Sequence, residues 1–169
     1  VLGLGLLGAS ICAAAKKLGL SNEIIGISRR QSTIEIAHAK EIIDKSSDSL
    51  ATLAGNFGED DLLILAVPTL AMKSVLSECQ EHVPPSVTIT DVASVKTKII
   101  EFAEQVYGDI PKNFVPGHPI AGSEKSGINA ANPDLFKNHK VVLTPEEMTS
   151  QGHINKVSEI WTRLGADVT

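Results

Sequence analysis

Short apolar runs alternate with amphipathic stretches along the 169 residues of this chain. The apolar runs are rich in Ile, Leu and Val, as buried parallel strands require, whereas the stretches between them repeat apolar residues at helical spacing. Strands are predicted at residues 1–2, 23–28, 42–43, 61–67, 87–90, 113–115, 141–143 and 165–169. Helical segments are predicted at residues 9–18, 32–40, 49–54, 70–83, 99–107 and 154–164. This alternation predicts an α/β fold in which a doubly wound, mostly parallel sheet carries helices on both faces.

The predicted helices supply packing faces, and the segments after the predicted strands supply the candidate ligand-binding residues. In the helix at residues 70–83, one face is expected to pack on the sheet, and it consists of Leu70, Val75, Leu76, Cys79 and Val83. In sheets of this kind, ligands bind beyond the carboxyl ends of the strands. The chemistry is therefore expected in the segments that follow the strands, which are residues 3–8, 28–30, 67–68, 91–96 and 117–127.

Gly3, Gly5 and Gly8 form a G-x-G-x-x-G turn between the first predicted strand and the first predicted helix. In a dinucleotide-binding turn, the first glycine permits the tight bend, the second lets the backbone approach a pyrophosphate and the third allows close helix–strand packing. The helix N-terminus then faces the phosphates. An ordinary tight turn is the alternative, but the strand–turn–helix context favours dinucleotide binding and a Rossmann-type domain spanning residues 1–169.

The end of the second predicted strand bears on which dinucleotide is bound. A domain that binds NAD usually carries Asp or Glu about 20 residues after the glycine turn. Here Ser28, Arg29 and Arg30 occupy that place, and no acid is present. A hydroxyl and two guanidinium groups suit a 2′-phosphate, so the sequence favours NADP and leaves NAD open. The alternative is that the two arginines are ordinary surface charges at a helix start.

His118 lies in a loop of small residues, GHPIAGSEKSG at residues 117–127, that follows a predicted strand. An imidazole exchanges protons near neutral pH, so a histidine at this place is a candidate general base. A core histidine bonded to the backbone is the equal alternative. The other histidines are expected to be solvated or structural, and they are His38, His82, His139 and His153.

Ser94 lies between a predicted strand and the next helix, in DVASVK at residues 91–96. We expect it to be the N-cap of that helix. The same hydroxyl can also face the ligand crevice and orient His118 or a substrate hydroxyl. Lys96 and Lys125 are candidate partners for phosphate or carboxylate groups, or simply solvated side chains, and no catalytic lysine is predicted.

Composition narrows the classes of protein. The chain carries 15 Lys and Arg against 20 Asp and Glu, a net charge of −5, which disfavours nonspecific nucleic-acid binding. Its 43% hydrophobic content argues against disorder, and no apolar run approaches the ~20 residues of a membrane span. The two distant cysteines, Cys12 and Cys79, form neither a disulfide scaffold nor a metal site, which points to a reducing cytoplasm. Because the sequence opens at Val1, inside the first strand, we expect it to be part of a longer protein.

Four motifs occur together in this chain. They are GLGLLGAS at residues 3–10, AVP at 66–68, DVASVK at 91–96 and GHPIAGSEKSG at 117–127, and VLTP at 142–145 accompanies them. In combination they resemble the prephenate/arogenate dehydrogenase family of tyrosine biosynthesis, over the whole chain and most specifically in the histidine loop. The resemblance implies an NAD(P)-dependent oxidative decarboxylation of prephenate to 4-hydroxyphenylpyruvate, or of arogenate to tyrosine, in the cytoplasm or a plastid stroma.

The resemblance also implies roles for individual residues. His118 would accept a hydrogen bond or a proton from the ring 4-hydroxyl, and Ser94 would hold His118 and the substrate in register. Ser123 and Glu124 would line or gate the substrate pocket. No metal is expected, and Val67 and Pro68 would pack near the nicotinamide. The full cofactor site would comprise Gly3, Gly5, Leu6, Leu7, Gly8, Ser28, Arg29, Arg30, Ala66, Val67, Pro68 and Asp91.

Members of the family follow the nucleotide-binding domain with a helical domain that dimerises and supplies a cation for the substrate carboxylate. That domain lies outside these 169 residues. The resemblance therefore implies a homodimeric whole protein, and a chain that alone turns substrate over weakly or not at all. Two other interpretations remain open: another Rossmann dehydrogenase, of the β-hydroxyacid type, or a non-catalytic dinucleotide-binding module.

Overall fold

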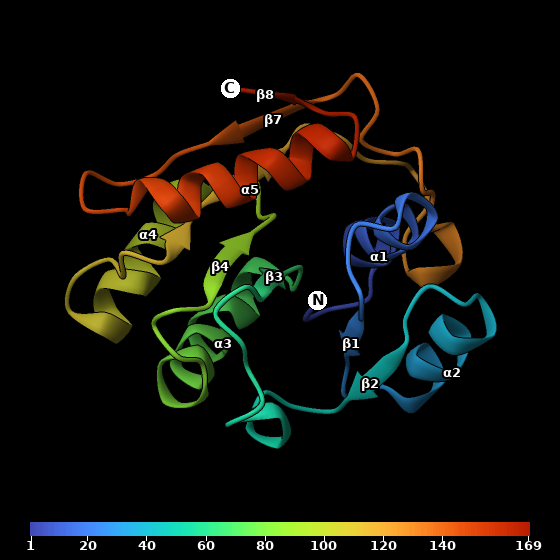
Figure 1. The fold of residues 1–169 in the computed structure, drawn as a ribbon, viewed down its shortest axis with the longest axis horizontal. Helices are drawn as coiled ribbons and strands as arrows, with labels where there is room; N and C mark the ends of the chain where they lie inside the picture. Colours follow the sequence, from blue (N-terminus) through green and yellow to red (C-terminus); the bar gives the residue numbers. More distant parts are fainter.

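The computed structural model describes residues 1–169, and its strands alternate with helices along almost the whole chain (Figure 1). The strands are β1 Ile25–Ile27, β2 Lys45–Ser47, β3 Leu62–Leu65, β4 Thr88–Asp91, β5 Phe114–Val115, β6 Gly117–Pro119, β7 Lys140–Leu143 and β8 Asp167–Val168. The helices are α1 Leu6–Leu18, α2 Gln31–Ala39, α3 Thr69–His82, α4 Lys96–Tyr107 and α5 Gln151–Arg163, with short 3-10 turns η1 Ala51–Leu53 and η2 Ile128–Ala130. This order confirms the predicted α/β alternation.

The main sheet changes its direction of winding at Leu2. Parallel bridges join Leu2 to Ile27 of β1 on one side and to Leu65 of β3 on the other. From there β1 pairs with β2, and β3 pairs through β4 with β5, all in parallel. The order β2, β1, Leu2, β3, β4, β5 is doubly wound, with a topological switch point beside Leu2 where a ligand crevice is expected. The remaining strands form a second sheet, in which β7 pairs antiparallel with β6 and parallel with β8.

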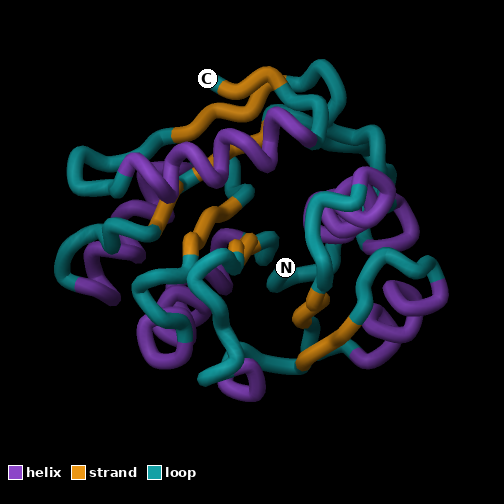
Figure 2. Tube along the Cα trace, in the orientation of Figure 1, coloured by secondary structure: helices purple, strands orange, loops and turns teal.

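Helices cover both faces of the main sheet because successive side chains of a strand point to opposite faces. In β3, Leu63 and Leu65 belong to the hydrophobic cluster of α3 and α4, whereas Ile64 belongs to the cluster that contains α5 and part of α1. A third cluster packs α1 against α2. Figure 2 shows the helices arranged around the strands in this way. The prediction of a sheet covered on both faces is therefore confirmed.

Two predictions are wrong, one about a buried side chain and one about a strand. Leu70 is 95% exposed, because it lies in the first turn of α3, ahead of the buried face that begins at Met72. Ile42 and Ile43 form no strand: both are buried in the cluster of α1 and α2, and the chain pairs with β1 only from Lys45 onward. β2 is a polar edge strand, so it lacks the apolar pattern that marks a strand in the sequence.

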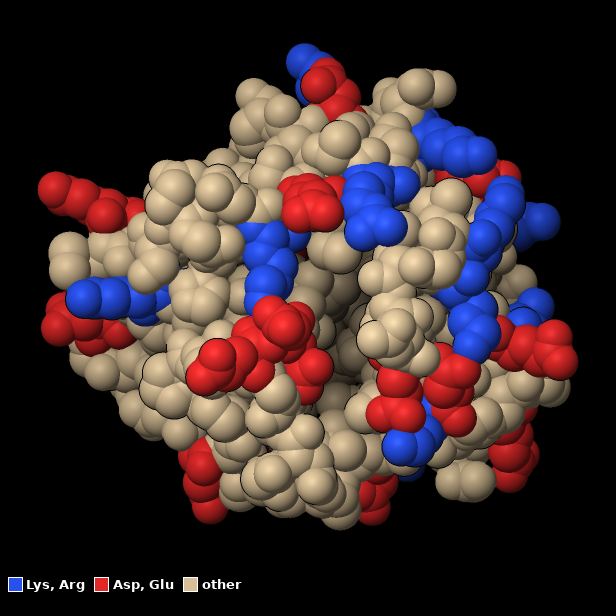
Figure 3. All heavy atoms as spheres, in the orientation of Figure 1, with Lys and Arg blue, Asp and Glu red and all other residues tan.

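The surface carries charges of both signs. Lys, Arg, Asp and Glu side chains are interspersed over the face drawn in Figure 3. That face is hollowed at its centre, between the side formed by α1 and α2 and the side formed by α3 and α4 (Figures 1 and 3). None of the helices combines the length and the apolar character needed to cross a membrane.

Candidate functional site

The glycine turn lies at the switch point, and each of its glycines meets a different constraint. Gly3 has a φ of 95°, and a Cβ there would lie 2.5 Å from the carbonyl oxygen of Ala66. At Gly8 a Cβ would lie 1.9 Å from the carbonyl oxygen of Gly3, so α1 packs directly on the turn. A Cβ at Gly5 would have no atom within 4 Å. The three positions therefore provide the tight bend, the close packing and the open approach that a dinucleotide-binding turn requires.

The N-terminus of α1 is available to an anion. Gly5 is its N-cap residue, no side chain caps it, and its first turn holds no acidic residue. The first N–H groups of a helix have no partners within the helix, and its dipole favours negative charge there. Together with the open space at Gly5, these groups fit the pyrophosphate of a dinucleotide. Leu6 and Leu7, predicted to contact the cofactor, are half-buried in this first turn.

The end of β3 lies against the glycine turn. The Cβ that Gly8 lacks would lie 3.0 Å from the Cβ of Ala66. The Cβ that Gly3 lacks would lie 3.1 Å from Cγ1 of Val67. Pro68 follows as the exposed N-cap residue of α3. The structure thus brings together two segments that the sequence assigns to the cofactor site, although they are more than fifty residues apart.

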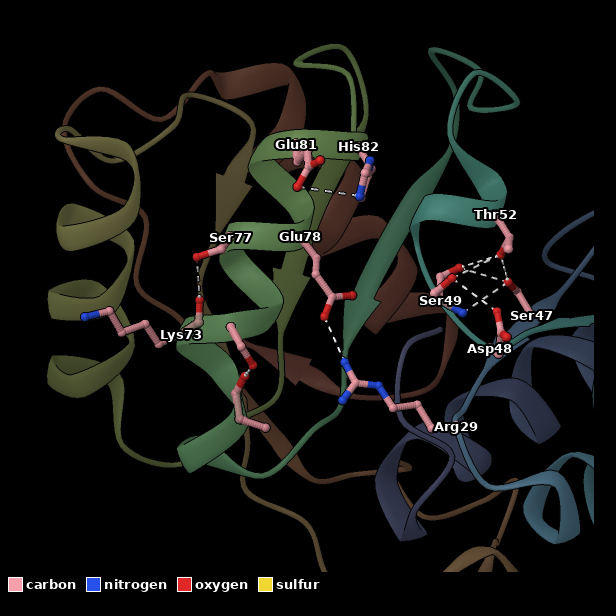
Figure 4. Close-up of polar contacts among 12 residues, drawn as sticks. Arg29, Ser47, Asp48, Ser49, Thr52, Lys73, Ser77, Glu78, Glu81 and His82 are labelled. Atoms are coloured by element: carbon pink, nitrogen blue, oxygen red, sulfur yellow. Dashed lines mark hydrogen bonds and ion pairs between the residues drawn. The ribbon is translucent and has the colours of Figure 1, made fainter.

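At the end of β1, Arg29 reaches across to α3 (Figure 4). Its Nη2 donates to Oε1 of Glu78 at 2.9 Å, while the Arg29 side chain remains 79% exposed. Ser28 Oγ accepts a hydrogen bond from the N–H of Arg30 at 3.2 Å, which shapes the turn into α2. No acid occupies the strand end itself, but Glu78 brings one beside it. This acid was not predictable from the strand end in the sequence, because Glu78 belongs to a different helix, 49 residues further along.

A cluster of hydroxyl side chains follows β2, the neighbouring strand (Figure 4). Ser47 Oγ and Thr52 Oγ1 both donate to the carbonyl oxygen of Ser49, at 2.8 and 2.9 Å. The N–H of Ser28 donates to the Ser47 carbonyl at 3.0 Å, so the cluster adjoins the end of β1. These hydroxyls satisfy one another and the local backbone, and they stabilise the turn after β2.

His118 lies in the middle of β6, where a loop was predicted. His118 pairs with Val142 of β7, and its side chain is half-buried. It lines an open pocket of about 380 Å³ together with Pro119, Ile120, Ala121, Gly122 and His139. A half-buried imidazole at an open pocket is accessible to a substrate, which is the position that a general base needs.

His139, which was expected to be solvated or structural, lines the same pocket as His118. The antiparallel pairing of β6 with β7 causes this, since the N–H of Ile120 donates to the carbonyl of Lys140 at 2.8 Å. The His139 side chain is exposed, and its Nδ1 lies 3.0 Å from the Lys137 carbonyl oxygen. The alternation of apolar residues does not reveal this pairing, because the two segments are about twenty residues apart and β6 holds Gly and Pro.

Ser94 is not a helix cap. α4 begins at Lys96 with Val95 as its N-cap residue, and no side chain caps it. Ser94 is exposed, and no hydrogen bond joins it to His118. The carboxylate of Asp91 serves the loop instead, because its Oδ2 accepts the N–H of Ala93 at 2.9 Å. The role of Ser94 toward His118 or a substrate stays a prediction.

Asp91 and Lys96 form a buried ion pair beside β6. The Lys96 Nζ contacts Asp91 Oδ2 and donates to the carbonyl oxygen of Gly117 at 2.7 Å. Burial raises the pKa of the Asp91 carboxyl, and the Lys96 ammonium opposes that rise. Burial likewise lowers the pKa of Lys96, against the attraction of Asp91. Lys96 is thus neither solvated nor free for a ligand phosphate, and both oxygens of Asp91 are engaged within the chain.

The remaining residues predicted for the substrate pocket lie in the loop after β6. Ser123 and Glu124 are exposed, and neither lines the pocket of His118. Ser123 Oγ accepts the N–H of Lys125 at 3.1 Å, which is a local turn contact. Their predicted contacts with substrate therefore need a partner or a loop conformation that brings them over the pocket.

His153 is the remaining histidine with a defined partner inside the fold. Its Nδ1 shares a hydrogen bond of 2.7 Å with Oγ1 of the buried Thr88, which ties α5 to β4. Burial lowers the pKa of His153, and the nearby Lys156 lowers it further. This histidine is structural, as predicted.

Comparison with known proteins gives concordant matches. Residues 11–169 match the family model described as the nucleotide-binding domain of prephenate dehydrogenase. A prephenate dehydrogenase from Lactococcus lactis subsp. cremoris is 39% identical over 147 residues, which make up 86% of this chain and 40% of that protein.

Solved structures show the same relationship. Prephenate dehydrogenase from Aquifex aeolicus, in complex with hydroxyphenyl propionate and NAD+, matches with a TM-score of 0.88 and 30% identity over 99% of this chain and 57% of its own. Arogenate dehydrogenase from Synechocystis matches with a TM-score of 0.87 and 33% identity over 99% of this chain and 57% of its own. The chain thus spans about half the length of the relatives that it matches.

Proposed function

Because this chain belongs to the prephenate dehydrogenase family, through its nucleotide-binding domain, we propose that it serves the oxidative decarboxylation of prephenate or arogenate with a nicotinamide dinucleotide. The observation that carries the proposal is the pairing of two features. An uncapped helix N-terminus with open space at Gly5 suits the dinucleotide, and a half-buried His118 at an open pocket suits the substrate hydroxyl.

For the cofactor, the chain binds a nucleotide, and we propose a preference for NADP over NAD. The Gly5 backbone and the first turn of α1 hold the pyrophosphate. Ser28, Arg29 and Arg30 supply a hydroxyl and two exposed guanidinium groups at the end of β1, where the 2′-phosphate is expected. Support for NAD comes from the Aquifex aeolicus relative, whose structure contains NAD+.

For the reaction, His118 acts as a general base on the ring 4-hydroxyl. When bound, the nicotinamide ring supplies the hydride acceptor. The imidazole takes the hydroxyl proton as the carbon loses its hydride, and the ring carboxylate leaves as carbon dioxide. The electron pair left behind makes the ring aromatic, and the proton returns from His118 to the oxygen, which completes a phenol. The open pocket beside His118 provides room for the ring.

We also propose a role for this chain within a longer protein. Residues 1–169 act as the nucleotide-binding domain of a homodimeric cytoplasmic enzyme, and a second domain supplies the cation for the substrate carboxylate. Ser94, Ser123 and Glu124 approach the substrate once that domain closes over the pocket. The length of the relatives, of which this chain covers about half, supports such a second part.

The test is a spectrophotometric assay of the full-length protein with prephenate or arogenate, each with NAD and with NADP. The proposal predicts reduced nicotinamide with at least one substrate, and faster with NADP at equal concentration. Dinucleotide binding without reduction, with either substrate, would instead identify a binding module. Reduction with a small β-hydroxyacid alone would identify another class of dehydrogenase.

A further inference from the structure

Among the ion pairs of the chain, the pair of Asp91 and Lys96 is the most deeply buried, with Asp91 fully buried and the Lys96 side chain 15% exposed. Lys96 Nζ donates to the carbonyl oxygen of Gly117 at 2.7 Å, and the N–H of Gly117 donates to Asp91 Oδ1 at 3.2 Å. One ion pair therefore holds both backbone polar groups of the residue that precedes His118. We call Asp91, Lys96 and Gly117 the clamp.

The backbone of Gly117 lies close to β4. A Cβ at Gly117 would lie 3.1 Å from the carbonyl oxygen of Asp91 and 3.4 Å from Oγ1 of Thr90. Thr90 Oγ1 in turn donates to the carbonyl oxygen of Val115 at 2.7 Å. Because two successive side chains of β4 hold the chain on either side of Pro116, the start of β6 is fixed relative to the main sheet.

The clamp is better explained by geometry than by stability. Burying two charges costs desolvation energy that their mutual attraction often fails to repay, so a buried ion pair is weak evidence of stabilisation. An ion pair with further hydrogen bonds does specify one arrangement of the groups around it. Here three of those hydrogen bonds go to backbone groups, two of them at Gly117.

We propose that Asp91 and Lys96 are positioning residues for His118: they fix the Gly117 peptide and thereby hold the imidazole at its place in the pocket. This inference rests on the function proposed for His118, although the geometry that it describes can be tested without turnover. It differs from the sequence prediction, in which Asp91 contacts the cofactor and Lys96 contacts a ligand or the solvent.

NMR spectroscopy of the 169-residue chain tests the positioning directly. A Lys96→Met variant loses the hydrogen bond to the Gly117 carbonyl oxygen, so the ring signals of His118 are expected to move. The amide proton of Gly117 is expected to exchange about tenfold faster, because its acceptor Asp91 is left without the cation that holds it in place. The ring signals of His38 and His82, which lie on other helices, serve as internal references and stay in place.

The matched control is Lys98→Met on the same helix. Lys98 is 47% exposed and pairs with Glu101 at 2.7 Å, so its loss is expected to leave the His118 and Gly117 signals unchanged. If Lys96→Met fails to fold, because Asp91 is left buried without its cation, the double variant Asp91→Asn/Lys96→Met removes both charges. A folded variant of either kind with the wild-type His118 ring signals and Gly117 exchange rate overturns the proposal.

Turnover of the full-length protein provides a second measurement. Lys96→Met is expected to lower kcat about 100-fold, as for a misplaced catalytic group, with the KM for the dinucleotide within about twofold of wild type. A fall in kcat with unchanged NMR signals of His118 also overturns the positioning role, because Lys96 would then act directly. Absence of turnover in the wild-type protein removes the proposed function and leaves the NMR comparison to decide the role of the clamp.

Discussion

The guanidinium of Arg29 lies 2.9 Å from the carboxylate of Glu78, so the end of β1 is tied to α3 across the switch point of the sheet (Figure 4). Arg29 is one of the three residues that the sequence assigns to a 2′-phosphate, together with Ser28 and Arg30. A phosphate that binds there must therefore compete with an acid of the same chain for the guanidinium donors. Under the proposed function, cofactor preference depends on the competition between the 2′-phosphate and the Glu78 carboxylate for the Arg29 guanidinium.

Substitutions at this pair are expected to change cofactor preference in opposite directions. Arg29→Ala lowers the affinity for NADP about tenfold relative to NAD, since it removes a charge-assisted hydrogen bond at an exposed site. Glu78→Gln raises the affinity for NADP, since it frees the guanidinium. Fluorescence titration with each dinucleotide measures both effects, and Arg163→Ala on α5 is the matched control, because Arg163 is an exposed arginine that also pairs with a glutamate, Glu159. The double variant Ser28→Asp/Arg29→Ala should prefer NAD, and an unchanged ratio would refute the role assigned to this strand end.

The glycine turn allows binding to be separated from folding. Gly5→Ala is expected to keep the free energy of unfolding within about 1 kcal/mol of wild type, because its Cβ meets open space. It should still weaken dinucleotide binding roughly tenfold or more, since the Cβ occupies the approach of the pyrophosphate.

Gly8→Ala is the counterpart, and it is expected to cost about 1–3 kcal/mol of stability, because its Cβ would overlap the Gly3 carbonyl oxygen. Urea denaturation and dinucleotide titration of both variants check the two predictions. Equal stability of the Gly5→Ala and Gly8→Ala variants would contradict the packing role of Gly8, and full binding by Gly5→Ala would contradict the approach role of Gly5.

The parts of the fold that were predictable from sequence are those with local signals. The apolar run of β3 and the glycine turn before α1 are complete within about ten residues, and the structure has both, although α1 begins at Leu6, three residues before the predicted helix. The exposed Leu70 shows what helical spacing cannot predict. The spacing identifies the apolar face of a helix, but not the residue at which that face begins to pack on the sheet.

The parts of the site that were not predictable depend on pairings between distant segments. His118 became a strand residue only through its pairing with Val142, and His139 joined its pocket through the same hairpin. Asp91 reaches Gly117, 26 residues away, through a contact that follows from strand order alone. The sequence pattern predicted Ser94 as the N-cap of α4. In the structure, the Asp91 carboxylate accepts the N–H of Ala93 in this loop, and α4 begins at Lys96, with Val95 as its N-cap residue.

The hydrogen bond between Thr88 and His153 predicts a pH dependence of stability. Burial lowers the folded-state pKa of His153 below its ordinary value of 6.5, so the unfolded chain binds more protons between these two values. The stabilisation is present above pH 6.5 and is lost as the pH falls through the folded-state pKa. His153→Gln should cost about 1 kcal/mol near neutral pH and flatten the decline below it.

Urea unfolding of wild type and His153→Gln over a series of pH values measures this dependence. His38→Gln is the control, since that exposed side chain hydrogen-bonds to the Ser46 hydroxyl at 3.2 Å and not to a buried partner. An identical loss of stability with acid in wild type and in His153→Gln would show that His153 does not carry the effect.

The most direct test of the account is the kinetic effect of His118→Asn in the full-length protein, beside the pocket control His139→Asn. His118→Asn is expected to lower kcat by roughly 10²–10⁴-fold, the range for loss of a general base, while the dissociation constant of the dinucleotide stays unchanged. His139→Asn should retain most of the activity, because the exposed His139 side chain takes no part in the proposed proton transfer. A His118→Asn enzyme that turns over prephenate and arogenate at the wild-type rate would contradict the account.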